Sequence, residues 1–243
     1  MKGFDPAKSF GSEVAAHYDE YKRGDEESAA SFLAEFAKEG TALEFAIGTG
    51  RIALPLAAKG ILVDGIELSP HMVEQLRAKP GGQNINLTIG DMSSATTNRH
   101  YPLVYLVFNT IFNLLTVDDQ IRCFENAARH LTPNGYFVVE TALPHACISP
   151  DKSDYVHTEY VGKETVVFDV ARYDPVTQLL EENHVQLTTQ GITMSPIVCR
   201  LITPGEMDLM ARIAGMRLIQ RFSNWQRTAF DINSKAHVSV YGF

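Results

Sequence analysis

The feature that most constrains the fold is a short apolar run that ends in a glycine-rich turn and leads into a helical pattern. Residues 42–47 form the apolar run, Gly48-Thr49-Gly50 interrupts it, and residues 51–59 carry helical spacing. The same cycle recurs downstream, with strands expected at 61–66, 84–89, 103–108 and 136–139 and helices at 70–79 and 118–131. Strands that alternate with helices predict a mostly parallel sheet with helices on both faces.

The pattern changes on either side of this core. Two helical patterns, at residues 11–21 and 26–38, precede the first strand. After about Pro144, apolar and polar residues alternate over longer stretches, which predicts an antiparallel β insert with strands at 156–171, 179–189 and 192–202. A helix at 204–214 and strands at 216–222 and 237–241 close the chain.

Charge and cysteine content narrow the function classes. The 243 residues carry 21 Lys and Arg against 29 Asp and Glu, a net charge of −8, which argues against binding to duplex nucleic acid. The three cysteines stand apart, so neither a disulfide framework nor a metal site is expected. The sequence shows no signal-like opening, and its most apolar stretch, residues 101–117, is shorter than the roughly 20 residues of a membrane helix. These features predict a cytoplasmic protein with no membrane partner.

The glycine-rich turn is paired with an acidic residue at the end of the second strand. Glu67 follows Gly48 by 19 residues (67 − 48 = 19). A carboxylate at this strand tip accepts hydrogen bonds from both hydroxyls of a ribose, while the glycines let the backbone approach a ligand closely. The pair predicts a cofactor that contains a nucleoside.

Two kinds of nucleoside cofactor are compatible with this turn. Residues 48–53 match the G-x-G-x-x-A fingerprint of dinucleotide-binding folds, which favours NAD. Three features argue against NAD: Glu44 lies inside the first strand, Gly90-Asp91-Met92 ends the third strand with a carboxylate and an apolar side chain, and two helical patterns precede the first strand.

Four segments resemble the class I S-adenosylmethionine-dependent methyltransferases, over roughly residues 10 to 140. They are LEFAIGTGR at 43–51, DGIELSPHM at 64–72, IGDM at 89–92 and LTPNGY at 131–136. Glu44 stands where the family commonly has aspartate, and Ala46 where it commonly has glycine. The resemblance implies a Rossmann-like, mostly parallel seven-stranded sheet with helices on both faces, and S-adenosylmethionine as the cofactor.

The resemblance also implies a cofactor site. The backbone around Ala46, Gly48 and Gly50 would line the methionine part, with Glu44 beneath it in the first strand, and Glu67 would hold the ribose hydroxyls. The remaining implied contacts are Leu68 and Met72 against adenine, Asp91 and the Met92 N–H at its polar edge, Tyr18 on an N-terminal helix that closes over the cofactor, and Phe108 and Asn109 facing the sulfonium.

The acceptor is expected to be a small molecule methylated on nitrogen or oxygen. Residues 107–113 lack the Asn-Pro-Pro-Tyr-like turn of enzymes that methylate bases, and the chain is similar to amino-sugar N-methyltransferases in its Gly-rich, Glu-Leu-Ser and Gly-Asp-Met segments. We expect three parts: residues 1–143 as N-terminal helices plus the cofactor-binding core, 144–202 as an antiparallel lid over the acceptor pocket, and 203–243 completing the sheet.

No catalytic residue is assigned from the sequence. A base is needed only where the acceptor must lose a proton, and the candidates are His145, His157, His184 and His237. Trp225 with Tyr160 and Tyr173 is a candidate aromatic pocket. Two other functions stay open at this point: an NAD-dependent oxidoreductase, and a catalytically silent module that binds S-adenosylmethionine and regulates a partner. The oligomeric state is not predicted.

Overall fold

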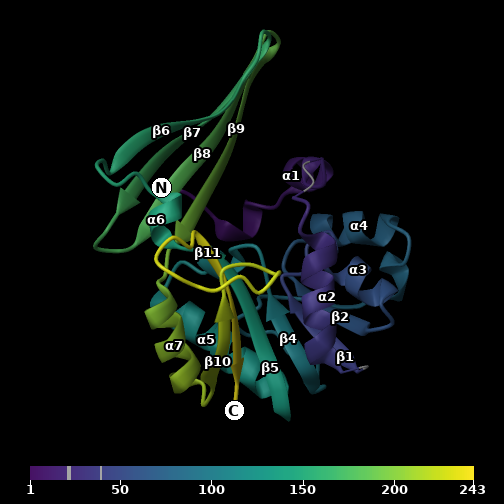
Figure 1. The fold of residues 1–243 in the computed structure, drawn as a ribbon. Helices are drawn as coiled ribbons and strands as arrows, with labels where there is room; N and C mark the ends of the chain where they lie inside the picture. Colours follow the sequence, from purple (N-terminus) through teal and green to yellow (C-terminus); the bar gives the residue numbers. More distant parts are fainter. Residues whose placement is uncertain (21–22, 39) are drawn as a thin grey trace.

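The computed structural model describes residues 1–20, 23–38 and 40–243. The chain forms two sheets, and the smaller one rises from one end of the larger one (Figure 1). Sheet A has seven strands in the order β10-β11-β5-β4-β1-β2-β3. Its strands are β1 Thr41–Phe45, β2 Leu62–Glu67, β3 Asn86–Ile89, β4 Tyr101–Leu106, β5 Leu131–Ala142, β10 Arg217–Phe222 and β11 Ala236–Gly242.

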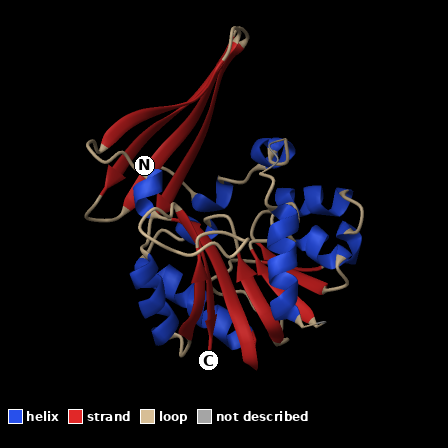
Figure 2. Ribbon diagram, in the orientation of Figure 1, coloured by secondary structure: helices blue, strands red, loops and turns tan. Residues whose placement is uncertain are grey.

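The five strands from β5 to β3 run parallel, and β11 and β10 complete the sheet in antiparallel pairings. Helices cover both faces (Figure 2). One apolar core lies under α5 (Val117–His130) and α7 (Pro204–Ile213). The other lies under α2 (Glu26–Ala37), α3 (Ala53–Ala58) and α4 (Pro70–Ala78). The expected α/β class and seven-stranded sheet are confirmed.

The helices α4 and α7 begin where the sequence supplies a side-chain cap. Ser69 accepts a hydrogen bond from the backbone N–H of Met72, and Pro70 takes the first position of α4, where its missing N–H costs nothing. Thr203 and Glu206 form a capping box at the start of α7. Pro55 lies in the first turn of α3, so it does not interrupt that helix.

Sheet B contains four antiparallel strands in the order β6-β7-β8-β9. They are β6 Asp154–Val161, β7 Thr165–Asp174, β8 Leu179–Thr188 and β9 Gly191–Arg200. The prediction of one strand over 156–171 is wrong, because a tight turn at Gly162-Lys163-Glu164 divides it into β6 and β7. Strand-forming β-branched and aromatic residues are frequent on both sides of Gly162, so the sequence reads as one strand across this turn.

Smaller elements differ from the sequence prediction. The helix expected at 11–21 is α1, Ser12–His17, and residue 21 lies outside the described residues. Residues 133–135, expected to form a turn, lie within β5. At this point the register of β5 against β4 shifts. Four short elements are additional: η1 Pro6–Lys8, η2 Gly82–Asn84, η3 Thr110–Asn113 and α6 Pro144–Cys147. Over the described ranges, no helix combines the length and the apolar character that a membrane crossing requires.

Candidate functional site

A cavity lies at the carboxyl ends of β1, β2 and β3, between the N-terminal segment and η3. It encloses about 710 Å³ of space free of protein atoms, counted out to its mouth and including open solvent. The residues that line it are Pro6, Phe10, Tyr18, Ala46, Gly48, Glu67, Leu68, Met72, Gly90, Asp91, Met92, Thr110, Asn113 and Leu114. Carboxyl ends of parallel strands are where ligands bind in open α/β sheets.

Glu67 is held rigidly at the centre of this cavity. One carboxylate oxygen accepts the N–H of Gly48 at 2.8 Å, and the other accepts the N–H of Ser69 at 2.8 Å. Burial raises the pKa of Glu67, and the two backbone donors oppose that shift. Each carboxylate oxygen has a further lone pair, so the group can also accept two ligand hydroxyls, as a ribose would require.

The glycine-rich turn has a left-handed backbone at three positions. The φ angles are 50° at Ala46, 57° at Gly48 and 79° at Gly50. Ala46 and Gly48 line the cavity, whereas Gly50 does not. A Cβ on Gly50 would lie 2.3 Å from Leu76 Cδ1, so this glycine lets α4 pack closely against the turn.

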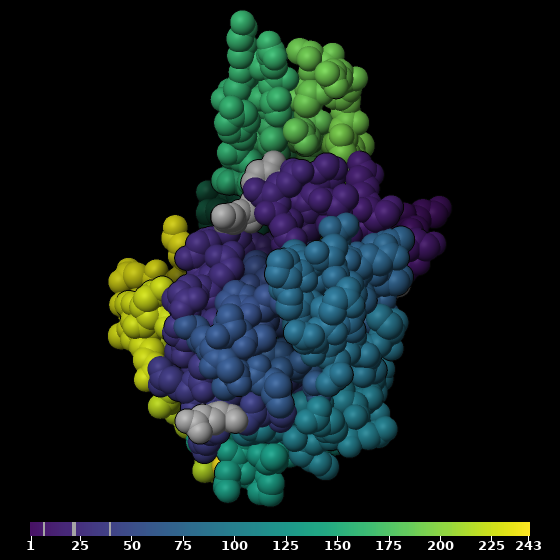
Figure 3. All heavy atoms as spheres, turned by 90° about the vertical axis from the view of Figure 1, so that its right-hand side faces the viewer, coloured from purple at the N-terminus to yellow at the C-terminus, as the bar shows by residue number. Residues whose placement is uncertain are grey.

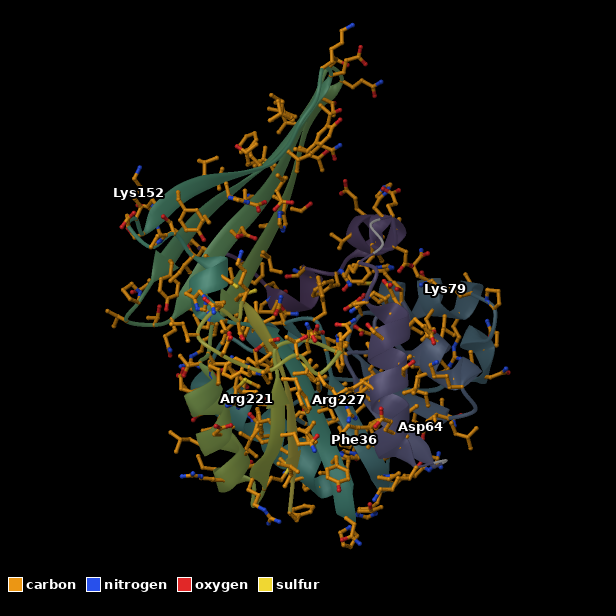
Figure 4. All side chains as sticks on the ribbon, viewed as in Figure 1. Phe36, Asp64, Lys79, Lys152, Arg221 and Arg227 are labelled. Carbon is orange, nitrogen blue, oxygen red and sulfur yellow. The ribbon has the colours of Figure 1, made fainter. Side chains whose placement is uncertain are left out.

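The N-terminal segment is tied down over the cavity by polar contacts. Asp19 accepts a hydrogen bond from the hydroxyl of Thr49 at 2.8 Å and pairs with Lys79, whose ammonium also donates to the Thr49 carbonyl. Lys79 directly follows α4 (Figure 4). Ser69 donates its hydroxyl to the backbone carbonyl of Phe10 at 2.6 Å. Tyr18 meets the edge of the Phe10 ring and lines the cavity.

The lining of the cavity also combines apolar and acidic groups. Leu68, Met72, Asp91 and Met92 all line it. Met72 and Met92 are buried, and one oxygen of Asp91 accepts the N–H of Ser93 at 2.6 Å. This combination suits a flat, apolar base with a polar edge.

Eight of the twelve predicted site residues line the cavity, and Glu44, Gly50, Phe108 and Asn109 do not. The Glu44 carboxyl is fully buried under the turn and accepts the hydroxyl of Tyr105 at 2.9 Å. Burial raises the pKa of Glu44 to about 8. The Phe108 ring lies under the guanidinium of Arg23, 3.3 Å from its central carbon. The Asn109 side chain accepts the backbone N–H of Ala142.

Six lining residues were not predicted. Thr110 and Asn113 belong to η3 and Leu114 directly follows it, just beyond the expected end of the fourth strand, so a longer reading of that strand tip would have found them. Gly90 lies inside the segment that carries Asp91 and Met92. Pro6 and Phe10 precede α1, and no spacing in the sequence links them to the sheet.

The candidate bases lie in different surroundings. His237 is fully buried in β11, where its ring nitrogens contact the hydroxyls of Thr141 at 3.0 Å and Ser239 at 2.8 Å. Burial lowers the pKa of His237 to about 3, so it is a neutral core residue. His145 is exposed on α6 and His157 is exposed on β6. His184 is half exposed on β8 and is hydrogen-bonded to Asp169.

The structure does not bring the three predicted pocket aromatics together. Trp225 packs against Phe32, with ring centroids 5.4 Å apart. Tyr160 pairs with Val167 near the free end of sheet B, whereas Tyr173 lies at the other end of β7. The hypothesis of one aromatic pocket formed by Trp225, Tyr160 and Tyr173 is therefore wrong.

One face of sheet B contacts a residue of the cavity wall, and we call it the inner face. Its base packs on sheet A: the Cys199 sulfur lies 3.8 Å from the Asn113 amide oxygen, and Asn113 lines the cavity. Farther out on this face, His184 bonds to Asp169 and approaches Glu182 at 3.5 Å. One carboxylate oxygen each of Asp169 and Glu182 and one ring nitrogen of His184 all lie within 4.8 Å of one another. Burial and the neighbouring charge of Asp169 raise the pKa of Glu182.

Comparison with known proteins gives concordant matches. Residues 42–135 match a family described as a methyltransferase domain. The chain is 34% identical to the CcbJ methyltransferase of Streptomyces caelestis, with a TM-score of 0.91 over 98% of this chain and 99% of that chain.

Two further matches are more distant. The chain is 29% identical over 143 residues to a dTDP-3-amino-3,6-dideoxy-alpha-D-glucopyranose N,N-dimethyltransferase of Streptomyces fradiae, which is 56% of this chain and 55% of that protein. The S-adenosylmethionine-bound structure of CalS10, an amino pentose methyltransferase from Micromonospora echinaspora, shares the fold with a TM-score of 0.69 and 21% identity over 94% of this chain and 95% of that chain.

Proposed function

The chain belongs to the S-adenosylmethionine-dependent methyltransferases, and we propose that the atom it methylates is the nitrogen of a small aliphatic amine. It is an enzyme that moves a methyl group from S-adenosylmethionine to a small-molecule acceptor. The G-x-G-x-x-A turn is compatible with both NAD and S-adenosylmethionine, and family membership decides for S-adenosylmethionine. It also argues against the two alternative functions, an NAD-dependent oxidoreductase and a catalytically silent regulatory module.

We propose that the cavity above β1 to β3 is the cofactor site. The fit rests on the chemistry of its lining: a carboxylate with two ordered oxygens at Glu67, apolar Leu68 and Met72 beside Asp91, and the open backbone of Gly48. No basic phosphate clamp is needed, since this cofactor has no pyrophosphate. S-adenosylmethionine supplies the methyl group on a sulfonium cation.

The observation that carries the amine proposal is the charge on the inner face of sheet B. Asp169 and Glu182 place two carboxylates beside His184 on the face that reaches the cavity through Cys199 and Asn113. Carboxylates in a partly buried setting attract an ammonium group and would hold a protonated amine near the mouth of the cavity. The acceptor pocket then lies between sheet B and the edge of sheet A, with residues 144–202 as its wall, as the sequence predicts.

The same residues offer a route for the proton that an ammonium must lose before its nitrogen can attack. Asp169 orients the His184 ring through one nitrogen, so the other nitrogen faces Glu182 and can take a proton. We propose His184 as the proton acceptor among the four histidines, since it alone of the four is oriented by a buried carboxylate in the described part of the chain. Alignment of two bound molecules supplies the remaining rate enhancement.

The test is turnover with a panel of acceptors, read as release of S-adenosylhomocysteine and as a mass gain of the acceptor. We expect primary and secondary amines, including amino sugars, to be methylated and phenols and carboxylates not to be. Glu182→Gln should raise the KM for the amine about tenfold and leave the KM for S-adenosylmethionine unchanged. Glu164→Gln, in the exposed turn between β6 and β7, is the matched control. Turnover of phenols alone would contradict the proposal.

A further inference from the structure

Toward its free end, the face of sheet B opposite the inner face is almost entirely apolar. The strand register places the residues of this free-end part in three rows of four: Val161, Val166, Leu187 and Ile192; Thr158, Phe168, Val185 and Met194; Val156, Val170, Asn183 and Pro196. Ten of these twelve positions are apolar, and none carries a charge. We call these twelve residues the outer apolar face.

Much of this face is in contact with solvent. Val161 is 72% exposed, Val156 and Ile192 are 64% exposed, and Met194 is 61% exposed. The free end of sheet B stands clear of the rest of the molecule in the space-filling view (Figure 3). Exposed apolar side chains that lie next to one another in this way mark an interaction surface.

The polarity of the sheet is the reverse of the usual arrangement. An antiparallel sheet with one packed face commonly puts apolar residues on that face and polar residues toward water. Here the inner face, whose base packs on sheet A, carries Asp169, Glu182 and His184, while no described part of the chain covers the free end of the outer apolar face. Burial of this outer face would therefore complete the sheet.

We propose that a second copy of this chain covers the outer apolar face, in a two-fold dimer with the sheets packed face to face. The face lacks charges, and so a partner must present an uncharged apolar surface of the same kind, which this chain itself has. The net charge of −8 and the absence of Lys or Arg among the twelve positions oppose an anionic membrane or a nucleic acid as the occupant.

The area available supports a dimer. Six residues of this face are 42–72% exposed: the four named above, Val170 and Leu187. Together they present on the order of 500 Å² of apolar surface. A stable interface buries roughly 800 Å² on each partner, and that area includes a polar rim. Asp154, Arg172 and Glu181 form the next row along the strands, and Lys163 and Glu164 occupy the turn at the other end. These residues supply a rim with both signs of charge.

The edges of sheet B are unsuited to association. Pro196 removes a backbone donor from β9, and β6 has an irregular register between Thr158 and Tyr160. Both features block the addition of a further strand. Two sheets would therefore associate through their faces, about 10 Å apart and with their strands about 30° from alignment.

The test is the mass of the full chain in solution, by light scattering after size exclusion and by sedimentation. We expect the wild type at twice 26.9 kDa and a Leu187→Lys, Met194→Lys double variant at 26.9 kDa. The control is Gln186→Lys, Thr193→Lys, which changes the adjacent residues on the inner face and should stay dimeric. Melting temperature and S-adenosylmethionine binding show whether each variant is folded.

A second pair of variants covers the case in which the lysine variants do not fold. Val156→Thr and Val161→Thr keep the β-branched shape, and each should raise the dimer dissociation constant about tenfold. The wild type is also mixed with phosphatidylcholine vesicles and sedimented. A wild-type protein that is monomeric at tens of micromolar would overturn the proposal, whether or not it sediments with the vesicles. Equal dissociation of the inner-face control would overturn it as well.

Discussion

The carboxylate of Glu140 holds the backbone N–H of Phe108 at 2.9 Å and, through its other oxygen, the indole N–H of Trp225 at 3.0 Å. Phe108 and its neighbour Asn109 both have left-handed backbones, with φ of 57° and 62°. Such a conformation costs about 1–3 kcal/mol for each residue that is not glycine and persists only where its surroundings enforce it. Glu140 at the end of β5 is the residue that enforces this corner, which leads directly into η3 on the cavity wall.

Glu140→Gln should therefore lower both stability and turnover. The amide has one acceptor oxygen where the carboxylate has two, so one of the two N–H groups loses its partner in a buried site, at a cost of about 1–3 kcal/mol. Urea unfolding and kcat for methyl transfer measure the two effects. Trp225→Phe removes the indole donor but keeps the Phe108 bond, so it should lower kcat less than Glu140→Gln does. Equal kcat for Glu140→Gln and the wild type would show that the corner does not depend on this carboxylate.

Ala46→Gly should stabilise the fold slightly. Ala46 has a left-handed φ of 50°, a conformation that costs an alanine about 1–2 kcal/mol and a glycine nothing. The greater freedom of glycine in the unfolded chain removes about 0.4–1 kcal/mol of that gain. We expect a net increase of about 0.5–1 kcal/mol in the free energy of unfolding, with S-adenosylmethionine affinity unchanged or higher, since the methyl group that lines the cavity is lost. A lower stability than the wild type would show that the methyl group packs favourably.

Local motifs made the centre of the site predictable from the sequence. The turn at Ala46 and Gly48 and the carboxylate of Glu67 are near one another in any parallel arrangement of β1 and β2, because the carboxyl ends of these strands are adjacent. The parallel sheet was predictable as well, because the alternation of strands and helices can be recognised from the spacing of apolar residues alone.

The remainder depends on contacts between distant segments. Phe10 reaches the cavity because Ser69 binds its carbonyl, 59 residues away along the chain. Gly50 was assigned to the cofactor, but its packing against Leu76 gives it a structural role. The contact from Trp225 to Glu140 spans 85 residues. No local pattern in the sequence encodes such pairings.

Glu67→Ala should weaken the binding of S-adenosylmethionine by about 1–3 kcal/mol, or roughly 5- to 150-fold in Kd. The variant removes a charged acceptor for two ribose hydroxyls and also releases the N–H groups of Gly48 and Ser69. Calorimetric titration measures the change. Glu74→Ala, at an exposed position of α4, is the control and should bind as the wild type does. An unchanged Kd for Glu67→Ala would remove this residue from the site.

Glu44 should make stability fall as the pH rises. Its carboxyl is fully buried beside Tyr105, and burial raises its pKa from 4.5 to about 8. The unfolded chain releases this proton near pH 4.5, whereas the folded chain keeps it up to about pH 8. Between these values the folded state binds more protons than the unfolded state, so the free energy of unfolding decreases as the pH increases.

Glu44→Gln should remove this pH dependence without removing the contact. The amide oxygen still accepts the hydroxyl of Tyr105, and no group is left to ionise. We expect the variant and the wild type to have similar stability at about pH 5, and the variant to be more stable by on the order of 3 kcal/mol at about pH 8. Urea unfolding at the two pH values measures the difference, and the exposed Glu74→Gln controls for the loss of one negative charge. Parallel stability curves for Glu44→Gln and the wild type would mean that Glu44 is already ionised in the folded chain.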